Sequence, residues 1–243
     1  MAMICYFSAT GNSKRVAERI AEAIADTAVS IEGLDPSEIK GKTLNLVSPV
    51  YFWTAPMMVQ EFLKGAEPSD LGFLVLTYGT TTGHYKHDAE AILKGKFSAS
   101  YQIRTPDTWT TEFDLSDSAL VEAQVTASEK EIDDVIVSIK EGKKGDFITK
   151  TKSAMGKPLS DQAFHLARAT KNFFLVDGCT GCGLCAERCP DKAIEITDGK
   201  PVWVKERCEI CFRCLHHCPA FAIQYGQGKT KKHGQYRNPY TKV

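Results

Sequence analysis

The sequence contains no long hydrophobic run. Across its 243 residues, no apolar stretch approaches the ~20 residues that a membrane-spanning helix requires. The first residues, Met1 to Cys5, carry neither the basic region nor the cleavage site of a secretory signal peptide. These absences predict a cytoplasmic protein that has no membrane span.

The sequence also lacks nucleotide-binding motifs and an excess of charge of one sign. Neither a Walker A loop nor a Gly-x-Gly-x-x-Gly motif occurs in the chain. The 30 Lys and Arg residues balance 30 Asp and Glu residues, although residues 227–243 hold five basic side chains and no acidic one. An acidic body with a basic tail favours protein partners over nucleic acid. The alternative for the tail is a frayed, solvated terminus.

Cysteine, in contrast, is abundant and clustered. Eight of the nine cysteines lie between residues 179 and 218, which in a cytoplasmic protein indicates metal binding rather than disulfides. They form two runs of the pattern Cys-x2-Cys-x2-Cys-x3-Cys-Pro, beginning at Cys179 and Cys208. The segments that follow the runs, 193–196 and 222–225, also correspond to each other. The region is therefore an internal duplication.

This spacing is typical of 4Fe-4S cluster ligands. Three cysteines two residues apart let a tight loop wrap one cluster, whereas the fourth, before proline, faces the other cluster. Structural zinc is the alternative, but zinc sites usually pair two Cys-x2-Cys knuckles across a longer gap. Residues 173–226 resemble the bacterial two-cluster ferredoxins. The expected ligand sets are Cys179, Cys182, Cys185 and Cys218 for one cluster, and Cys208, Cys211, Cys214 and Cys189 for the other.

The N-terminal region alternates short apolar strands with amphipathic helices. This alternation predicts an α/β domain with a doubly wound parallel sheet, covered by helices on both faces. Loops at the carboxyl ends of such strands meet in a common ligand crevice. We expect strands at 4–7, 29–31, 44–50, 73–78 and 100–104, and helices at 13–26, 56–65, 86–94 and 117–141.

The loop between the first strand and the first helix reads Ser-Ala-Thr-Gly-Asn-Ser, residues 8–13. Its backbone N–H groups, its hydroxyls and the positive end of the helix dipole suit a phosphate dianion. An ordinary helix cap is the alternative. The loop resembles the phosphate loop of flavodoxins, which binds the phosphate of FMN. The resemblance implies cofactor-binding roles for Ser8, Thr10, Gly11, Asn12 and Ser13.

Two later loops follow strands where flavodoxins hold the flavin ring. By this resemblance, Tyr85 is a candidate stacking residue, and Tyr51 and Trp53 compete for the opposite face of the ring. Packing against the following helix is the alternative for each aromatic side chain. The later of these two loops, residues 79–85, is rich in threonine rather than acidic as in flavodoxins. The full set of expected ring contacts is Tyr51, Phe52, Trp53, Thr80, Thr81, Thr82, Gly83 and Tyr85.

The whole chain resembles a flavodoxin–ferredoxin fusion protein of the kind found in anaerobes. We expect a flavodoxin-like FMN-binding domain at 1–142, a linker with a short helix at 143–172, a small α+β two-cluster ferredoxin domain at 173–226 and a basic tail at 227–243. The predicted function is transfer of low-potential electrons between two 4Fe-4S clusters, FMN and a redox protein that docks on the chain. The alternative is an oxidoreductase that reduces a small substrate at FMN, although the sequence offers no catalytic acid–base constellation. A third hypothesis keeps the clusters but makes the N-terminal domain a docking scaffold without FMN.

Overall fold

A parallel sheet forms the centre of the N-terminal half. The computed structural model describes residues 2–152 and 154–243. The sheet has six strands in the order β2-β1-β3-β4-β5-β6, and all its pairings are parallel. The order 2-1-3-4-5 of the first five strands is flavodoxin-like, which confirms the expected fold class. The strands are β1 (Ala2–Tyr6), β2 (Ala28–Ser30), β3 (Thr43–Pro49), β4 (Asp70–Tyr78), β5 (Ala99–Arg104) and β6 (Gly145–Asp146).

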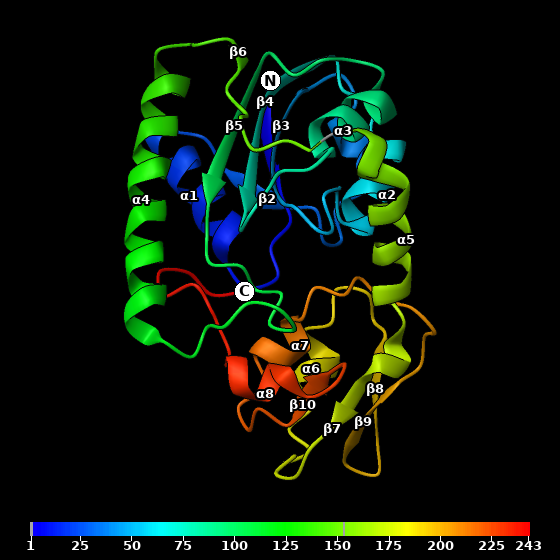
Figure 1. Cartoon of the computed structure of the whole chain (residues 1–243). Helices are drawn as coiled ribbons and strands as arrows, with labels where there is room; N and C mark the ends of the chain where they lie inside the picture. Colours follow the sequence, from blue (N-terminus) through cyan, green and yellow to red (C-terminus); the bar gives the residue numbers. More distant parts are fainter. Residues whose placement is uncertain (1, 153) are drawn as a thin grey trace.

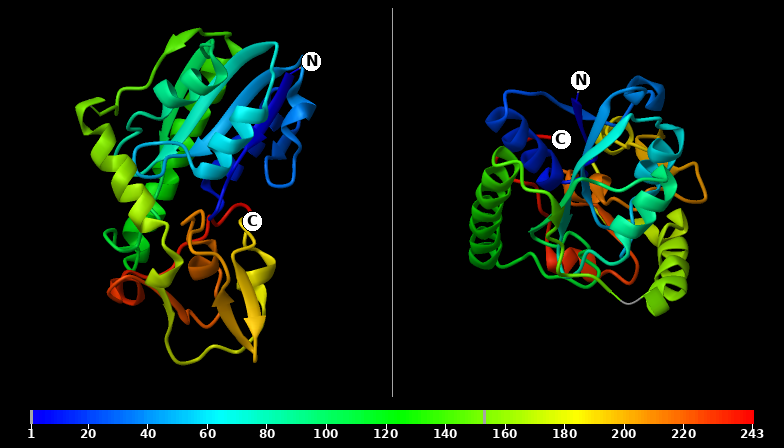
Figure 2. Two further views of the ribbon diagram at one scale, coloured as in Figure 1. Left: turned by 90° about the vertical axis from the view of Figure 1, so that its right-hand side faces the viewer. Right: turned by 90° about the horizontal axis from the view of Figure 1, so that it is seen from above.

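Helices cover both faces of this sheet, as Figure 1 and the view from above in Figure 2 show. Helices α1 (Asn12–Ala23) and α4 (Ser118–Lys140) lie on one face, and α2 (Met57–Gly65) and α3 (Tyr85–Leu93) lie on the other. The consecutive residues Leu74 and Val75 of β4 point to opposite faces, and both are fully buried. Strands buried on both faces read as continuous apolar runs, which is why these strands were recognisable in the sequence.

The segment after α4 stays attached to the sheet. Strand β6 extends the edge beside β5, and the amide N–H of Thr82 donates to the carbonyl of Lys150 at 2.7 Å. Helix α5 (Lys157–Ala167) follows, and it begins with a proline in its first turn, where proline is tolerated. Three short 3-10 helices complete the connections: η1 (Pro36–Ile39), η2 (Ala154–Gly156) and η3 (Thr170–Asn172).

The C-terminal part is a small α+β unit whose two halves follow the sequence duplication. Strands β7 (Phe173–Leu175) and β10 (Ile223–Tyr225) pair antiparallel, and β8 (Ile194–Thr197) pairs with β9 (Lys200–Trp203). Each cysteine run includes a one-turn helix, α6 (Leu184–Glu187) or α7 (Arg213–His216). Aromatic rings of both parts meet in one core, where Phe52 and Trp109 join Phe173 and Phe212.

The basic tail is ordered rather than frayed. After α8 (Lys229–His233), the chain returns towards the sheet, and Figure 1 shows the C-terminus between the two parts. Tyr236 is only 4% exposed and Asn238 only 9%. The alternative of a solvated terminus is therefore wrong for this segment. Among the described residues, no helix combines the length and apolar character needed to cross a membrane.

Candidate functional site

The eight clustered cysteines surround two cavities in the C-terminal part. Each cavity combines three cysteines of one run with the last cysteine of the other run. The duplication explains why the last cysteine of each run lies in the other cavity, because the short helices α6 and α7 of the two runs pack side by side. The structure thus brings together Cys179, Cys182, Cys185 and Cys218 at one cavity, and Cys189, Cys208, Cys211 and Cys214 at the other.

The surroundings of the sulfur atoms suit thiolate ligands. The amide N–H of Ala193 donates to Sγ of Cys189 at 3.3 Å, and that of Ala222, at the equivalent place in the duplication, donates to Sγ of Cys218 at 3.3 Å. Burial, the largest cause, and nearby acidic groups raise the pKa of Cys208 to about 12, which disfavours a free thiolate. Iron bonded to the sulfur would supply the missing stabilisation, and backbone N–H groups near sulfur are typical of iron–sulfur sites. The donor set therefore fits a thiolate-bound cluster.

The two cysteine cavities differ in their exposure. Cys182 of the first set is exposed to solvent, whereas Cys189 and Cys208 of the second set are buried. The cysteines of the first set thus border the surface of the C-terminal part. The second set lies deeper, and its loop at Cys211 contacts the N-terminal part.

A third cavity, of about 240 Å³, lies at the carboxyl ends of strands β1, β3, β4 and β5. This is the edge at which doubly wound sheets bind their ligands. The cavity gathers residues from three segments singled out in the sequence. These are Ser8, Thr10, Asn12 and Ser13 of the first loop, Tyr51, Phe52 and Trp53 of the second, and Thr80 and Thr81 of the third.

The first loop has the features of an anion site. Within the described chain, no side chain caps the N-terminus of α1, so an ordinary Ser or Thr cap does not account for the loop sequence. The hydroxyl of Ser8 instead accepts from the N–H of Gly11 at 3.2 Å, and the hydroxyls of Ser13 and Thr77 are 2.8 Å apart. An uncapped helix N-terminus beside several hydroxyls fits a phosphate.

Four of the expected flavin contacts do not line the cavity. Gly11 forms the turn into α1, and the hydroxyl of Thr82 donates to the carbonyl of Lys150 at 3.0 Å. Gly83 packs directly on Trp53. Tyr85 is fully buried in the core between the sheet and α3. Helix α3 starts at this residue, and the first turn directs the ring inward, so its position does not support the stacking role.

Two further walls of the cavity lie outside the set of expected ring contacts. The loop after β5 contributes residues 105–109, and the second cysteine run contributes residues 210–212. The first of these could have been found, because it follows the next parallel strand. Asp107 is the one carboxylate among the described lining residues, and burial raises its pKa. The wall of residues 210–212 depends on how two distant segments of the chain pack together, and no local pattern in the sequence predicts that packing.

Residues 210–212 also line the second cysteine cavity, so this stretch separates the two cavities. Ile210 and Phe212 have φ of +53° and +56°, and the equivalent residues of the first run are Gly181 and Gly183. A left-handed conformation costs about 1–2 kcal/mol for an L-residue, and strain of this kind concentrates at functional sites. Phe212 stacks on Trp109, with ring centroids 4.6 Å apart. The two residues with a strained backbone thus form this wall of the cavity.

Two charged side chains of the second run hold the parts together. Arg213 forms an ion pair with Glu32 and donates to the carbonyl of Ser8 at 2.6 Å. Glu209 is 2% exposed, and its Oε2 accepts from the N–H of Met58 at 2.9 Å. Glu209 therefore caps helix α2 across the interface, and its burial raises the pKa of the carboxyl to about 8.

The Glu209→Ala variant is expected to lower the apparent thermal midpoint of the anaerobic protein by about 6 °C. A lost N-cap and an unpaired buried N–H cost about 2 kcal/mol together, and each kcal/mol shifts the midpoint of a chain this long by about 3 °C. Amide exchange should also accelerate in α2. Asp117→Ala, which removes the cap of α4 within the N-terminal part, is the control and should leave exchange in α2 unchanged. If the rate of amide hydrogen exchange in α2 were the same in both variants, Glu209 would not be a cap of α2 across the interface.

Comparisons with known proteins agree with this geometry for the C-terminal part. Residues 171–219 match the family described as 4Fe-4S dicluster domain, and the chain has no match among curated proteins. Two solved structures are similar at 16% identity. A flavoprotein from Bacteroides uniformis ATCC 8492 has a TM-score of 0.36 and aligns over 43% of this chain and 90% of its own. A short-chain flavodoxin associated with a PDU bacterial microcompartment has a TM-score of 0.35 and aligns over 42% of this chain and 80% of its own.

The fold assignment of the N-terminal part rests on its strand order rather than on these two likenesses. The order 2-1-3-4-5, with helices on both faces, is that of the flavodoxin-like sheet. The eight cysteines and the matching domain support two 4Fe-4S clusters in the C-terminal part. The chain therefore combines a flavodoxin-like N-terminal domain with a 4Fe-4S dicluster ferredoxin domain at residues 171–219.

Proposed function

We propose that this chain is an electron-transfer protein in which FMN occupies the cavity at the end of the sheet. One observation carries the proposal: residues 210–212 line both this cavity and the cavity of the second cysteine set. A cofactor at the sheet edge would be separated from a cluster only by that stretch. When bound, FMN exchanges one or two electrons and each cluster exchanges one, so the protein supplies spacing and electrostatics.

The exposure of the cysteines suggests an order for the sites. The set that includes Cys182 borders the solvent, and the set that includes Cys211 borders the flavin cavity. The surface set would therefore face an external redox protein, and the buried set would face FMN. Because the sequence has no nucleotide-binding motif, we expect electrons to be exchanged with a docked redox protein rather than directly with NAD(P)H.

The lining residues divide into a polar and an aromatic part. The phosphate would be held by residues of the loop before α1 and of its first turn: Ser8, Thr10, Asn12 and Ser13. Phe52, Trp53 and Trp109 offer apolar surface for a flat ring. Phe52 and Trp53 both have positive φ and form a tight turn between Tyr51 and Thr54. Both aromatic side chains are thus held at the cavity at some cost in backbone strain.

A flavin-dependent reductase is the second candidate. It is favoured by Asp107, whose pKa is raised by burial and which accepts from the N–H of Trp109 at 3.0 Å. A buried carboxyl group whose pKa is raised is a candidate general acid beside a reducible substrate. Sustained turnover of a small substrate by the isolated chain, lost in Asp107→Asn, would favour this candidate over pure electron transfer.

The test is a cofactor count on protein purified under strict anaerobiosis. We expect about one FMN and about eight iron atoms per chain. The Thr10→Ala, Asn12→Ala double variant should raise the dissociation constant for FMN at least tenfold, because each hydrogen bond to a charged group contributes about 1.5–3 kcal/mol. Its iron content should not change. Thr126→Ala, an exposed site on α4, is the control. A chain that is replete in iron but neither contains nor binds FMN would refute the assignment.

A further inference from the structure

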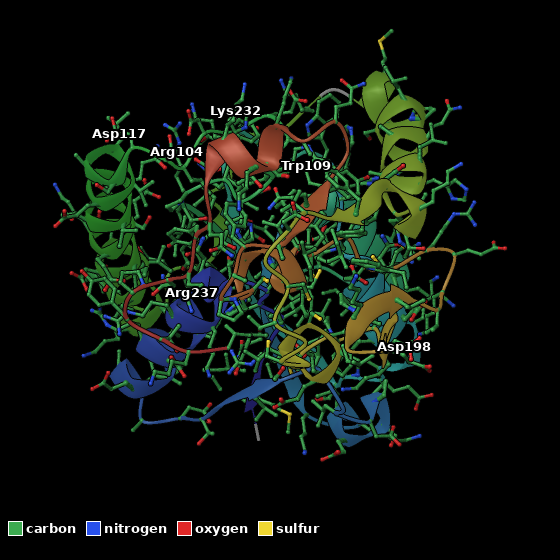
Figure 3. All side chains as sticks on the ribbon, turned by 90° about the horizontal axis from the view of Figure 1, so that it is seen from below. Arg104, Trp109, Asp117, Asp198, Lys232 and Arg237 are labelled. Carbon is green, nitrogen blue, oxygen red and sulfur yellow. The ribbon has the colours of Figure 1, made fainter. Side chains whose placement is uncertain are left out.

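The last ten residues, 234–243, form a strap that connects the two parts of the molecule; we call this segment the C-terminal strap. Figure 3, seen from below, shows Arg237 on this strap beside helix α1. At its start, Gln235 donates from Nε2 to the carbonyl of Cys218 at 2.8 Å. Near its end, Thr241 donates to Glu18 of α1 at 2.7 Å. The strap thus runs from a cysteine loop to the helix that follows the phosphate loop.

The middle of the strap contacts the phosphate loop directly. The amide N–H of Asn238 donates to the carbonyl of Thr10 at 2.8 Å. Gly11 has φ of +104°, and a Cβ at this position would lie 2.7 Å from Cβ of Asn238. The strap therefore lies so close that only glycine fits beneath it. This close contact is a second reason why position 11 requires glycine, besides its positive φ.

Two strap side chains converge on one atom of the loop, the Oδ1 of Asn12. The hydroxyl of Tyr236 donates to it at 2.7 Å, and Nδ2 of Asn238 donates to it at 3.1 Å. The orientation of Asn238 is itself fixed, because its Oδ1 accepts from the N–H of Tyr240 at 3.0 Å. The N–H of Tyr240 thus fixes the orientation of the Asn238 amide, and the Asn238 amide in turn fixes the orientation of the Asn12 amide.

The consequence concerns the other end of the Asn12 side chain. With Oδ1 engaged by two donors, Nδ2 must point away from the strap, and it lies 3.4 Å from the carbonyl of Pro106. Both Asn12 and Pro106 line the flavin cavity. The arrangement presents an N–H donor, and not a carbonyl oxygen, on the side where an anion would bind. An amide in the opposite orientation would repel a phosphate.

We propose that Tyr236 and Asn238 are positioning residues of the flavin-phosphate site, acting through the amide of Asn12. The ligand class is a phosphate monoester dianion, and the inference rests on the proposed binding of FMN at residues 8–13. The strap is also anchored on the ferredoxin domain, because the N–H of Tyr236 donates to Nδ1 of His216 at 3.1 Å. Retention of the flavin phosphate is therefore coupled to docking of the two domains.

The test compares FMN with riboflavin, which has the same ring but no phosphate. Asn238→Asp keeps the shape of the side chain but replaces the Nδ2 donor by an oxygen. The new carboxylate would turn the Asn12 amide so that its Nδ2 no longer faces the phosphate. We expect the dissociation constant for FMN to rise about tenfold or more, because the charge-assisted hydrogen bond from Asn12 is lost and a negative charge approaches the phosphate. Binding of riboflavin should change less than about twofold, because riboflavin has no phosphate for Asn12 to bind. Iron content and the thermal midpoint report on folding.

Two further variants separate positioning from general support. Tyr236→Phe should weaken FMN binding, whereas Tyr240→Phe should not, because Tyr240 is 54% exposed and its interaction with Arg15 needs no hydroxyl. In an Asn12→Ala background, Asn238→Asp should have much less additional effect on FMN, as expected for residues that act through one group.

The outcomes distinguish the two proposals. If the wild type binds no FMN, the proposed function fails and this inference fails with it. If the wild type binds FMN and Asn238→Asp binds it equally well, only the role of the strap is overturned. Equal weakening for FMN and riboflavin, or full additivity with Asn12→Ala, would also overturn it, because either result would show a merely structural role.

Discussion

Replacement of Cys189 by alanine is expected to remove the cluster of the second cysteine run, although Cys189 belongs to the first run. Cys189 is 8% exposed and lines one cavity with Cys208, Cys211 and Cys214. No spare cysteine of the C-terminal part can replace the lost ligand, because each of the others already belongs to one of the two expected ligand sets. The iron content should fall from about eight to about four atoms per chain. The spectrum of the reduced protein should retain only the surface cluster.

Matched variants identify which cluster is lost. If ligation is crossed, the EPR spectrum of Cys189→Ala should match that of Cys211→Ala, and the spectrum of Cys218→Ala should match that of Cys182→Ala. Cys5→Ala is the control, because Cys5 is buried in the sheet, lines neither cysteine cavity and should not affect iron. A Cys189→Ala spectrum that matches Cys182→Ala would show that each run binds its own cluster. Loss of the cluster beside the cavity should also let the flavin titrate independently of the remaining iron.

The sequence predicted the first five strands of the sheet, but not β6, because the signals of those five strands are local. The strand predicted at 44–50 is β3 (Thr43–Pro49), and the helix predicted at 117–141 is α4 (Ser118–Lys140). Apolar runs mark strands that are buried on both faces, and the periodicity of 3.6 residues marks the helices. The pattern of the cysteines is equally local, because one loop supplies three ligands. These features do not depend on how the two domains dock.

The features that sequence reasoning missed depend on contacts between distant segments. The wall of residues 210–212 lies inside a cysteine run, where the sequence suggests only cluster binding. The C-terminal strap carries basic residues and no apolar periodicity, so it resembles a free tail although Tyr236 is buried. Tyr85 is buried and does not line the cavity, because the helix that starts at this residue, which counting from the strand end ignores, sets its direction. In each case, tertiary packing decides the position of the side chain.

The largest expected loss of stability follows replacement of Arg213 by methionine. The side chain of Arg213 is 6% exposed and that of its partner Glu32 is 26% exposed. The guanidinium also donates to the carbonyl of Arg188 at 3.1 Å and to that of Ser8 at 2.6 Å. Methionine fills part of the volume but leaves Glu32 without its partner and the carbonyl of Ser8 without this donor. Removing one member of a buried ion pair costs about 3–5 kcal/mol, and partial exposure of Glu32 places the expected value near 3 kcal/mol.

This cost should appear as a fall of about 9 °C in the apparent thermal midpoint of the anaerobic protein. Arg19→Met is the matched control: Arg19 lies on α1 and pairs with Glu129 and with the exposed Asp133, and a surface pair contributes about 1 kcal/mol or less. Equal shifts for the two variants would contradict the role of Arg213 at the interface. A second measurement separates docking from general stability. Because Arg213 holds the carbonyl of Ser8, at the start of the phosphate loop, its loss should also weaken FMN binding, whereas Arg19→Met should leave FMN binding unchanged.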